Sequence, residues 1–353
     1  MRFIGNKENL LDRIKTILDK NGVYGNSFFD FFSGTTSVAK YFKKLGFHVF
    51  SSDILYFSYC LQKAYIENNA PITFSKLLPV IGHNSGFLFC EPYECVLSYL
   101  NLLSPFKGFI YNNYTPTGTK DLAQPRMYFT DENGAKIDAI RLEIERLKEK
   151  SLISDYEYYF LLAALIESVP FYSNIAGVYA AFHKKWDPRA LKPFELKPIT
   201  PLISDKKCSS FCDNSLNIIG KVNCDILYLD PPYNERQYPP NYHLLETIAR
   251  YDYPKISGVT GMRDYNDQKS DFCNARKALE ALDNIAKNAK YKFLILSYSS
   301  EGIMKNDSIL EVLGRYGKVS LDAIEYIRFK SNSNGVNKNK RTVQELVYIL
   351  RKK

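Results

Sequence analysis

The most specific chemical motif in the chain is the tetrapeptide Asp230-Pro231-Pro232-Tyr233. Residues 225–229 before it read DILYL and predict a buried strand, so the motif would lie at the carboxyl edge of a sheet, where open α/β folds bind ligands. The two prolines preset a rigid turn, in which the Asp230 carboxylate and the Pro231 carbonyl could both face one amino group. Tyr233 would add an aromatic face.

This arrangement suits an amine whose lone pair is delocalised into a ring, as in adenine. Two hydrogen-bond acceptors that draw on its protons would restore the nucleophilicity of the nitrogen toward a sulfonium methyl group, without a covalent enzyme intermediate. A plain turn at the end of a strand would explain the same four residues, so the rest of the chain has to be weighed with them.

A second turn, residues 30–39 (DFFSGTTSVA), is rich in small side chains and lies between a predicted strand and a predicted helix. The amino-acid moiety of a ligand could approach such a backbone closely. The candidate cofactor-binding residues of this turn are Asp30, Phe32, Gly34 and Thr35. Because the turn holds a single glycine, the GxGxxG pyrophosphate fingerprint is absent, which disfavours a nicotinamide cofactor.

Asp53 ends the next predicted strand, 23 residues after Asp30. This spacing places its carboxylate to accept hydrogen bonds from ribose hydroxyls. An acidic residue at a strand end is otherwise usually a helix cap, so the spacing is what favours a ligand-binding role.

The elements that must position these residues alternate between helix and strand. Helical periodicity over 7–20, a strand at 27–32, a helix after it and a strand at 47–53 predict a βαβ unit and a parallel sheet. The alternation returns late in the chain with a strand at 224–229, a helix at 271–289, a strand at 293–297, and a closing hairpin formed by 319–329 and 343–350. Between 71 and 205 it is lost, and helices at 137–148 and 156–168 indicate an inserted region.

Composition limits the class of protein. The 353 residues are 45% hydrophobic, enough for a sizeable core, and the net charge of +9 favours an anionic partner, either nucleic acid or an acidic membrane. No apolar run is long enough to span a bilayer and the first residues do not form a signal-peptide core, so we expect a cytoplasmic protein. The seven cysteines form no CxxC pair, and we expect no metal site.

Five segments, taken in order, resemble the alpha group of DNA adenine methyltransferases, whose familiar members are the Dam and FokI-type enzymes. These segments are Phe3-Ile4-Gly5-Asn6-Lys7, residues 30–39, Asp53, residues 230–233 and residues 294–299. Residues 230–250 and 173–186 resemble the FokI-type branch over longer stretches. The resemblance covers most of the chain. It implies an α/β fold, namely a Rossmann-like S-adenosylmethionine-dependent methyltransferase sheet with an inserted, mainly helical target-recognition region.

The resemblance also implies an activity: site-specific methyl transfer from S-adenosylmethionine to adenine N6 in duplex DNA, as part of a restriction-modification system. Residues 1–70 would be the cofactor-binding part of the catalytic domain, 71–205 the target-recognition insert, and 206–353 the remaining catalytic part. The expected partners are double-stranded DNA and, as a candidate, a restriction endonuclease acting separately. We expect a monomer without a membrane partner.

Residue roles follow from the same resemblance. Asp230, Pro231, Pro232 and Tyr233 would be catalytic, with Asp230 also near the cofactor. Phe3 and Lys7 would hold the methionine end of the cofactor, Asp53 its ribose, and Asp213 would lie near its adenine. A turn at a strand end explains Asp213 equally well.

Two other functional classes were weighed. A nucleotide-dependent dehydrogenase is disfavoured by the missing glycine fingerprint and by the DPPY motif, and a non-catalytic DNA-specificity module would have no reason to keep Asp230 beside Asp53. Cytosine-C5 transfer needs a cysteine nucleophile, usually after proline, and none of the seven cysteines follows a proline. Binding of S-adenosylmethionine rather than NAD would discriminate among these classes.

Overall fold

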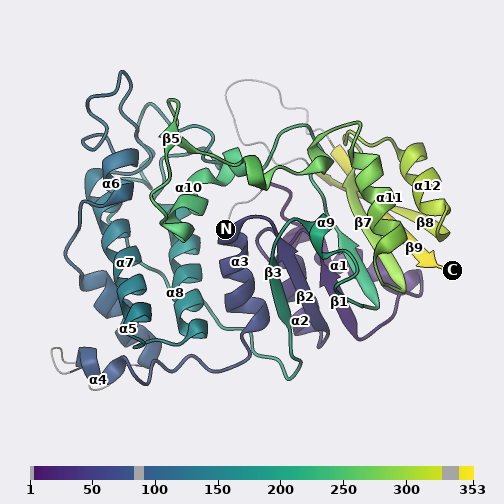
Figure 1. The fold of residues 1–353 in the computed structure, drawn as a ribbon, viewed down its shortest axis with the longest axis horizontal. Helices are drawn as coiled ribbons and strands as arrows, with labels where there is room; N and C mark the ends of the chain where they lie inside the picture. Colours follow the sequence, from purple (N-terminus) through teal and green to yellow (C-terminus); the bar gives the residue numbers. More distant parts are fainter. Residues whose placement is uncertain (1–3, 83–90, 328–341) are drawn as a thin grey trace. The chain divides into compact units, whose positions relative to one another are not determined.

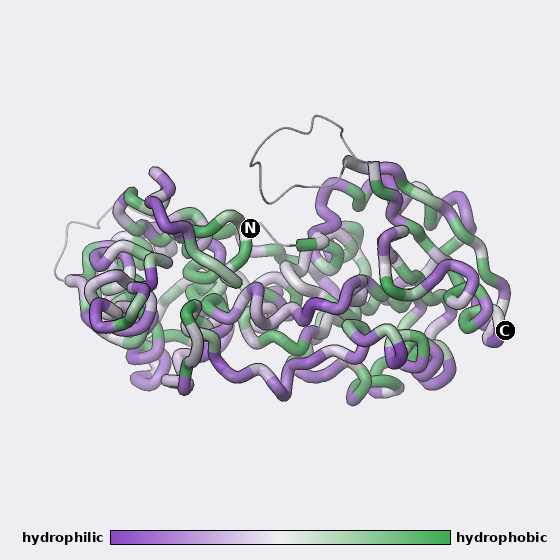
Figure 2. Tube along the Cα trace, turned by 90° about the horizontal axis from the view of Figure 1, so that it is seen from above, coloured by the Kyte–Doolittle hydropathy of each residue, from purple (hydrophilic) through white to green (hydrophobic). Residues whose placement is uncertain are grey.

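The computed structural model describes residues 4–82, 91–327 and 342–353, which divide into two compact units (Figure 1). The sheet unit comprises Ile4–Gln62, Ser204–Pro239 and Asn266–Lys353. The helical unit comprises Lys63–Ile203 and Pro240–Tyr265. In both units, hydrophobic and hydrophilic stretches alternate along the trace, as amphipathic elements require (Figure 2).

The sheet unit is built on a seven-stranded mixed sheet with the strand order β3-β2-β1-β4-β7-β9-β8. Its strands are β1 (Ser27–Asp30), β2 (His48–Asp53), β3 (Ser209–Cys212), β4 (Ile226–Leu229), β7 (Phe293–Ser299), β8 (Gly317–Ile327) and β9 (Thr342–Lys352). The first five pair in parallel, whereas β9 is antiparallel to both β7 and β8. The predicted parallel sheet and closing hairpin are therefore confirmed.

Helices cover both faces of the parallel strands. The helical segments of this unit are η1 (Glu8–Leu10), α1 (Leu11–Lys20), α2 (Ser37–Lys44), α3 (Tyr56–Gln62), α9 (Ser215–Ile218), η5 (Asn266–Gln268), η6 (Asp271–Cys273), α11 (Ala278–Asn288) and α12 (Asn306–Gly314). Phe28 stacks on Phe42 of α2, while its neighbour Phe29 points to the opposite face and joins a core with Leu282 of α11 and Ile309 of α12. Burial on both faces explains why β4 and β7 read as continuous apolar runs.

The helical unit contains most of the long helices of the chain. Its elements are η2 (Lys63–Glu67), α4 (Leu78–Ile81), α5 (Pro92–Leu102), α6 (Phe109–Tyr114), α7 (Asp131–Glu149), α8 (Asp155–Ser168), η4 (Val169–Phe171), α10 (Pro239–Arg250) and the short antiparallel strands β5 (Ile256–Ser257) and β6 (Met262–Arg263). A capping box of Ser154 and Glu157 begins α8, which is buried along nearly its whole length. Among the described residues, no helix has the length and apolarity needed to cross a membrane.

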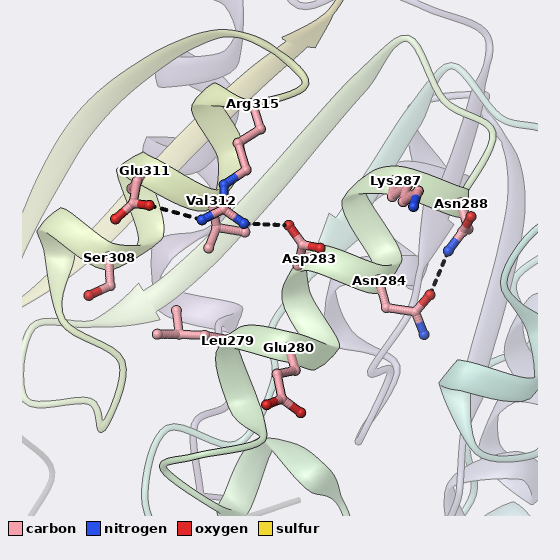
Figure 3. Close-up of a pocket in the computed structure, with 10 residues that line it drawn as sticks. All are labelled: Leu279, Glu280, Asp283, Asn284, Lys287, Asn288, Ser308, Glu311, Val312 and Arg315. Carbon is pink, nitrogen blue, oxygen red and sulfur yellow. Dashed lines mark hydrogen bonds and ion pairs between the residues drawn. The ribbon is translucent and has the colours of Figure 1, made fainter.

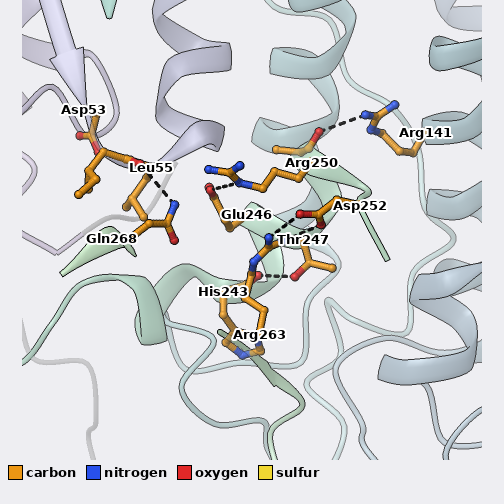
Figure 4. Close-up of polar contacts among 12 residues, drawn as sticks. Asp53, Leu55, Arg141, His243, Glu246, Thr247, Arg250, Asp252, Arg263 and Gln268 are labelled. Atoms are coloured by element: carbon orange, nitrogen blue, oxygen red, sulfur yellow. Dashed lines mark hydrogen bonds and ion pairs between the residues drawn. The ribbon is translucent and has the colours of Figure 1, made fainter. Parts of the chain in front are cut away.

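The division into units differs from the sequence-based boundaries in two respects. Residues 206–353 were expected to form one continuous part of the catalytic domain, yet 240–265 lie in the helical unit, which also begins at Lys63 rather than at 71. Arg141 of α7 forms hydrogen bonds with residues 240–265. Its guanidinium donates to the carbonyls of Ile248 (3.0 Å) and Ala249 (3.1 Å) at the carboxyl end of α10 (Figure 4). The predicted helix at 271–289 begins only at Ala278, after the short turn η6.

Candidate functional site

Three aspartates lie at neighbouring strand ends on one edge of the sheet. Asp30 ends β1, Asp53 ends β2 and Asp230 directly follows β4. Because β1 pairs in parallel with both β2 and β4, the carboxyl ends of all three strands meet at the same edge. The structure therefore brings together the three acidic residues that the sequence singled out.

Asp230 is paired with a lysine that is shared with a second carboxylate. The Lys7 Nζ lies 2.9 Å from Asp230 Oδ1 and 3.1 Å from Glu345 Oε1. Glu345 is 1% exposed and also accepts a hydrogen bond of 2.5 Å from Ser297 Oγ. Because β9 runs antiparallel to β7, Glu345 lies beside Ser299, the last residue of β7, at the same edge as Asp230.

These contacts set the protonation states of the cluster. Burial raises the pKa of Asp230 to about 6, Lys7 opposes this shift, and Glu345 adds to it. Burial lowers the pKa of Lys7, but Asp230 and Glu345 together raise it well above its ordinary value. Lys7 therefore stays charged, and Asp230 is an ionised, oriented acceptor above about pH 6. Its side chain remains 19% exposed.

The rest of the DPPY turn is fixed against the sheet unit. Pro231 is buried, and Pro232 and Tyr233 are half-buried. The carbonyl of Tyr233 accepts a hydrogen bond from the backbone N–H of Ile303 at 2.9 Å, and its side chain packs against the hydrophobic core. The turn is thus rigid before any ligand arrives.

Asp30 has one carboxylate oxygen without a hydrogen-bond partner. The side chain is 1% exposed; Oδ2 accepts from Ser33 Oγ at 3.1 Å and from the N–H of Ala39 at 3.2 Å, whereas Oδ1 has no partner among the described residues. Burial raises the pKa of Asp30 to about 7, Ser33 opposes this, and Asp230 and Asp53 add to it. An orphaned oxygen amid three carboxylates is a site that a cationic ligand would satisfy.

Asp53 forms a hydrogen bond with the small-residue turn, residues 30–39. Its Oδ2 accepts from the N–H of Gly34 at 2.7 Å and its Oδ1 from the N–H of Leu55 at 2.9 Å, ahead of α3 (Figure 4). The carbonyl of Gly34 in turn accepts from Ser58 Oγ at 2.6 Å. Thr35 is buried, and Thr36 adopts a left-handed φ of 62°, which sets the direction of the backbone at the end of the turn.

The remaining predicted residues lie around this edge. The N–H of Asp213 donates to the carbonyl of Asp53 at 3.1 Å, and its own Oδ1 accepts from Asn214 and Asn217, so Asp213 lies next to Asp53. Phe32 is half-buried and makes an edge-to-face contact with Phe272. Phe3 falls outside the described residues. Within the described residues, no group of three or more His, Cys, Asp or Glu side chains has the geometry of a metal site.

Glu345 and Ser297 were not predicted from the sequence. A signal for Glu345 was present, because Val343, Glu345 and Val347 occupy alternate positions of β9 and all three are buried. A charged residue on the inward face of an amphipathic strand requires a buried partner. The identity of that partner, Lys7, could not be read from local pattern.

A shallow groove between α11 and α12 has no chemistry of this kind (Figure 3). Three of its charged groups pair with one another: Arg315 contacts Asp283 at 3.2 Å and Glu311 at 2.9 Å. None of the residues that line it belongs to the strand-end cluster.

Comparison with known proteins shows the family of the chain. The model of the D12 class N6 adenine-specific DNA methyltransferases matches residues 3–312. The chain belongs to this family.

Several curated relatives are similar over nearly the whole chain. The type II methyltransferase M.FokI of Planomicrobium okeanokoites is 43% identical over 318 residues, which cover 90% of this chain and 47% of the relative. The modification methylase StsI of Streptococcus sanguinis is 38% identical and covers 100% and 52%. The type II methyltransferase M.NlaIII of Neisseria lactamica is 36% identical and covers 100% and 99%. The chain thus spans about half the length of the first two relatives and nearly all of the third.

Proposed function

We propose that this protein transfers a methyl group from S-adenosylmethionine to the exocyclic N6 of adenine in duplex DNA at a specific sequence. The observation that carries the proposal is the rigid DPPY turn, whose Asp230 carboxylate is oriented by Lys7 at the edge that also holds Asp30 and Asp53. Membership of the D12 family supports the adenine and DNA assignments.

The residues at the edge fit S-adenosylmethionine, which is a cation. Asp30 offers an unpartnered buried oxygen, and the nearby carboxylates favour positive charge. Asp53 and Asp213 would present carboxylate oxygens to ribose and adenine groups, and Phe32, Gly34 and Thr35 would line the amino-acid end. When bound, the cofactor supplies an electrophilic methyl group on a sulfonium.

The chain's own groups would activate the amine. Asp230 and the carbonyl of Pro231 would accept hydrogen bonds from N6, while Tyr233 would stack on the base and Pro232 would keep the turn rigid. The amine loses one proton as it is methylated, and Asp230, with a pKa raised to about 6, is matched to accept that proton near neutral pH. Between turnovers, the ion pair with Lys7 keeps the Asp230 carboxylate ionised and oriented.

The two units would have different functions. A mixed sheet with five parallel strands and a closing antiparallel hairpin is compatible with a Rossmann-like S-adenosylmethionine-dependent methyltransferase sheet, and the mainly helical unit would be the target-recognition region. By analogy with relatives that are named type II methyltransferases, the protein would act in restriction-modification. We further infer that it acts as a monomer, with any endonuclease acting separately.

The test is transfer of labelled methyl to duplex DNA, with nucleoside mass spectrometry of the product. N6-methyladenine is expected, and Asp230→Ala should lower kcat by roughly 10²- to 10³-fold, a loss comparable to that of one oriented transition-state donor. Asp283→Ala, on α11, is the matched control and should retain full activity. If 4-methylcytosine were the sole product, the substrate assignment would be wrong.

A further inference from the structure

Residues 294–299 are one of the five segments that resemble the alpha group, yet no predicted catalytic or cofactor-binding residue lies in them. The whole segment belongs to β7, which is buried along its length. After β7 the chain turns sharply, because the N–H of Gly302 donates to the carbonyl of Ser299 at 2.9 Å. Residues 298–304 are called the β7 loop here.

The β7 loop winds around the side chain of its own first residue. Tyr298 is 1% exposed, and its ring belongs to the hydrophobic core of the sheet unit. The Tyr298 hydroxyl accepts a hydrogen bond from the N–H of Met304 at 3.2 Å, so the end of the loop returns to the residue at which the loop begins. Met304 is itself buried in the same core.

Gly302 lets the loop backbone approach the Tyr298 ring closely. A Cβ at this position would lie 2.1 Å from Cε1 and 2.6 Å from Cζ of Tyr298, well inside the separation of about 3.5–4 Å at which carbon atoms pack. The φ of Gly302 is not left-handed, so this contact, and not the backbone conformation, requires a glycine. Any larger residue must displace the loop, the ring or both by roughly 1 Å or more.

The residue between Gly302 and Met304 contacts the DPPY turn. The N–H of Ile303 donates to the carbonyl of Tyr233 at 2.9 Å, and the side chains of both residues pack against the core that contains Tyr298. Because the backbone is fixed on either side of Ile303, the direction of this donor depends on the Tyr298 ring. The position of the Tyr233 backbone is therefore linked to the end of β7.

The start of the loop is also tied to β9. The N–H of Ser300 donates to the carbonyl of Gln344 at 2.9 Å, and the N–H of Gln344 donates to Ser300 Oγ at 3.3 Å. The next residue of β9 is Glu345, which shares Lys7 with Asp230. The same loop therefore borders the ion pairs of Asp230 as well as the hydrogen bond to the last residue of the DPPY turn.

We propose that the β7 loop sets the position of Tyr233 for the methyl-accepting base, with Tyr298 and Gly302 as positioning residues. This inference rests on the proposed function and adds two residues that act through Tyr233. The loop is held by hydrogen bonds within the chain, so Tyr233 is oriented in advance and less conformational entropy is lost when a base stacks on it. A misplacement of about 1 Å at such a site can lower a rate by roughly 10²-fold.

Gly302→Ala tests the close contact. The added Cβ should move the loop and lower kcat on duplex DNA by roughly 10²-fold. S-adenosylmethionine affinity, measured by calorimetry, should stay at the wild-type value, because Asp30 and Asp53 lie on β1 and β2. Gly314→Ala, in α12 of the same unit, is the matched control: a Cβ there has no atom within 4 Å, so kcat should not change.

A duplex with 2-aminopurine in place of the target adenine gives a second readout. Stacking on an aromatic ring quenches the fluorescence of this base, so its complex with Gly302→Ala should be brighter than its complex with the wild type. This signal reports on the placement of Tyr233 and does not depend on turnover.

Tyr298→Phe tests the same loop if Gly302→Ala folds poorly. It keeps the ring that packs on Gly302 and removes only the acceptor of the Met304 N–H, so kcat should fall roughly 2- to 10-fold, as expected for one lost hydrogen bond, with unchanged S-adenosylmethionine affinity. A wild-type kcat in Tyr298→Phe and in a folded Gly302→Ala would overturn the inference. So would an equal loss of kcat and cofactor affinity, which would indicate general damage to the sheet unit.

The two levels of inference fail in different ways. A wild-type protein that forms no N6-methyladenine in DNA would refute the proposed function. A wild-type protein that is active, with loop variants that match it in kcat and in 2-aminopurine fluorescence, would refute only the role of the β7 loop.

Discussion

Binding of S-adenosylmethionine should release a proton from Asp30. Burial raises the pKa of this carboxyl from 3.8 to about 7, a difference that corresponds to about 4 kcal/mol. Because the folded-state pKa is raised, protonated Asp30 contributes stability that is full below about pH 3.8 and is lost as the pH rises through about 7. The ionised carboxylate is the costly form, and a cationic ligand would offset that cost.

The assay is isothermal calorimetry between about pH 5.5 and 7.5, in buffers that differ in ionisation enthalpy. At about pH 6, Asp30 is about 90% protonated without ligand, so binding should release close to one proton and the affinity should rise up to tenfold per pH unit. Near pH 7.5 the slope should flatten, because the carboxyl is then mostly ionised before binding.

Asp30→Asn should remove this linkage. Loss of one charge-assisted hydrogen bond, about 1.5–3 kcal/mol, predicts roughly 10- to 100-fold weaker binding near pH 7.5, with an enthalpy that no longer depends on the buffer. Asp230→Asn is the control: it should keep a pH-dependent affinity, with the slope moved to lower pH because the Asp230 charge contributes to the raised pKa of Asp30. Binding by the wild type without proton release, or a wild-type pH slope in Asp30→Asn, would refute the reasoning.

Three further predictions follow from contacts at the same edge. Glu345→Gln removes a charge that raises the pKa of Asp230, so the acid limb of the pH profile of kcat should move to lower pH; an unmoved limb would mean that Glu345 does not act on Asp230. Asp53→Ala should weaken S-adenosylmethionine binding by about tenfold and lower the free energy of unfolding by about 1–2 kcal/mol, because two backbone N–H groups lose their acceptor. Calorimetry measures the affinity and denaturant unfolding measures the stability. An unchanged affinity would show that the cofactor site is wrongly placed. Lys7→Met leaves Asp230 and Glu345 buried without their cation, so kcat and S-adenosylmethionine affinity should both fall, with the larger loss in kcat; an unchanged kcat would mean that Lys7 does not orient Asp230.

Local pattern was enough to place most of the sheet and its strand ends. The apolar run before Asp230 and the helical periodicity over 7–20 are signals of single elements, and the strand and helix that they predicted are present. Three of the predicted acidic residues meet because parallel strands share an edge, a rule that needs no side-chain detail.

Long-range partnerships were beyond that pattern. Lys7 and Glu345 are separated by most of the chain, and only the register of β9 against β7 brings Glu345 to the sheet edge that holds Asp230. The orphaned oxygen of Asp30 depends on burial, which periodicity does not reveal. The apolar side of α10 fits a helical core as well as a sheet face, so sequence could not assign that helix to a unit.

The placement of α10 has a consequence for engineering and for evolution by recombination. The chain enters and leaves the helical unit twice, once around 63–203 and again around 240–265, so the unit is encoded in two separate blocks. In a chimera that exchanges only the first block, helices from the relative would pack against the native α10. The residue that replaces Arg141 would then have to form the hydrogen bonds to the carbonyls of Ile248 and Ala249. Exchanging the helical unit between relatives therefore requires a paired graft, and natural recombination would have to preserve both blocks together.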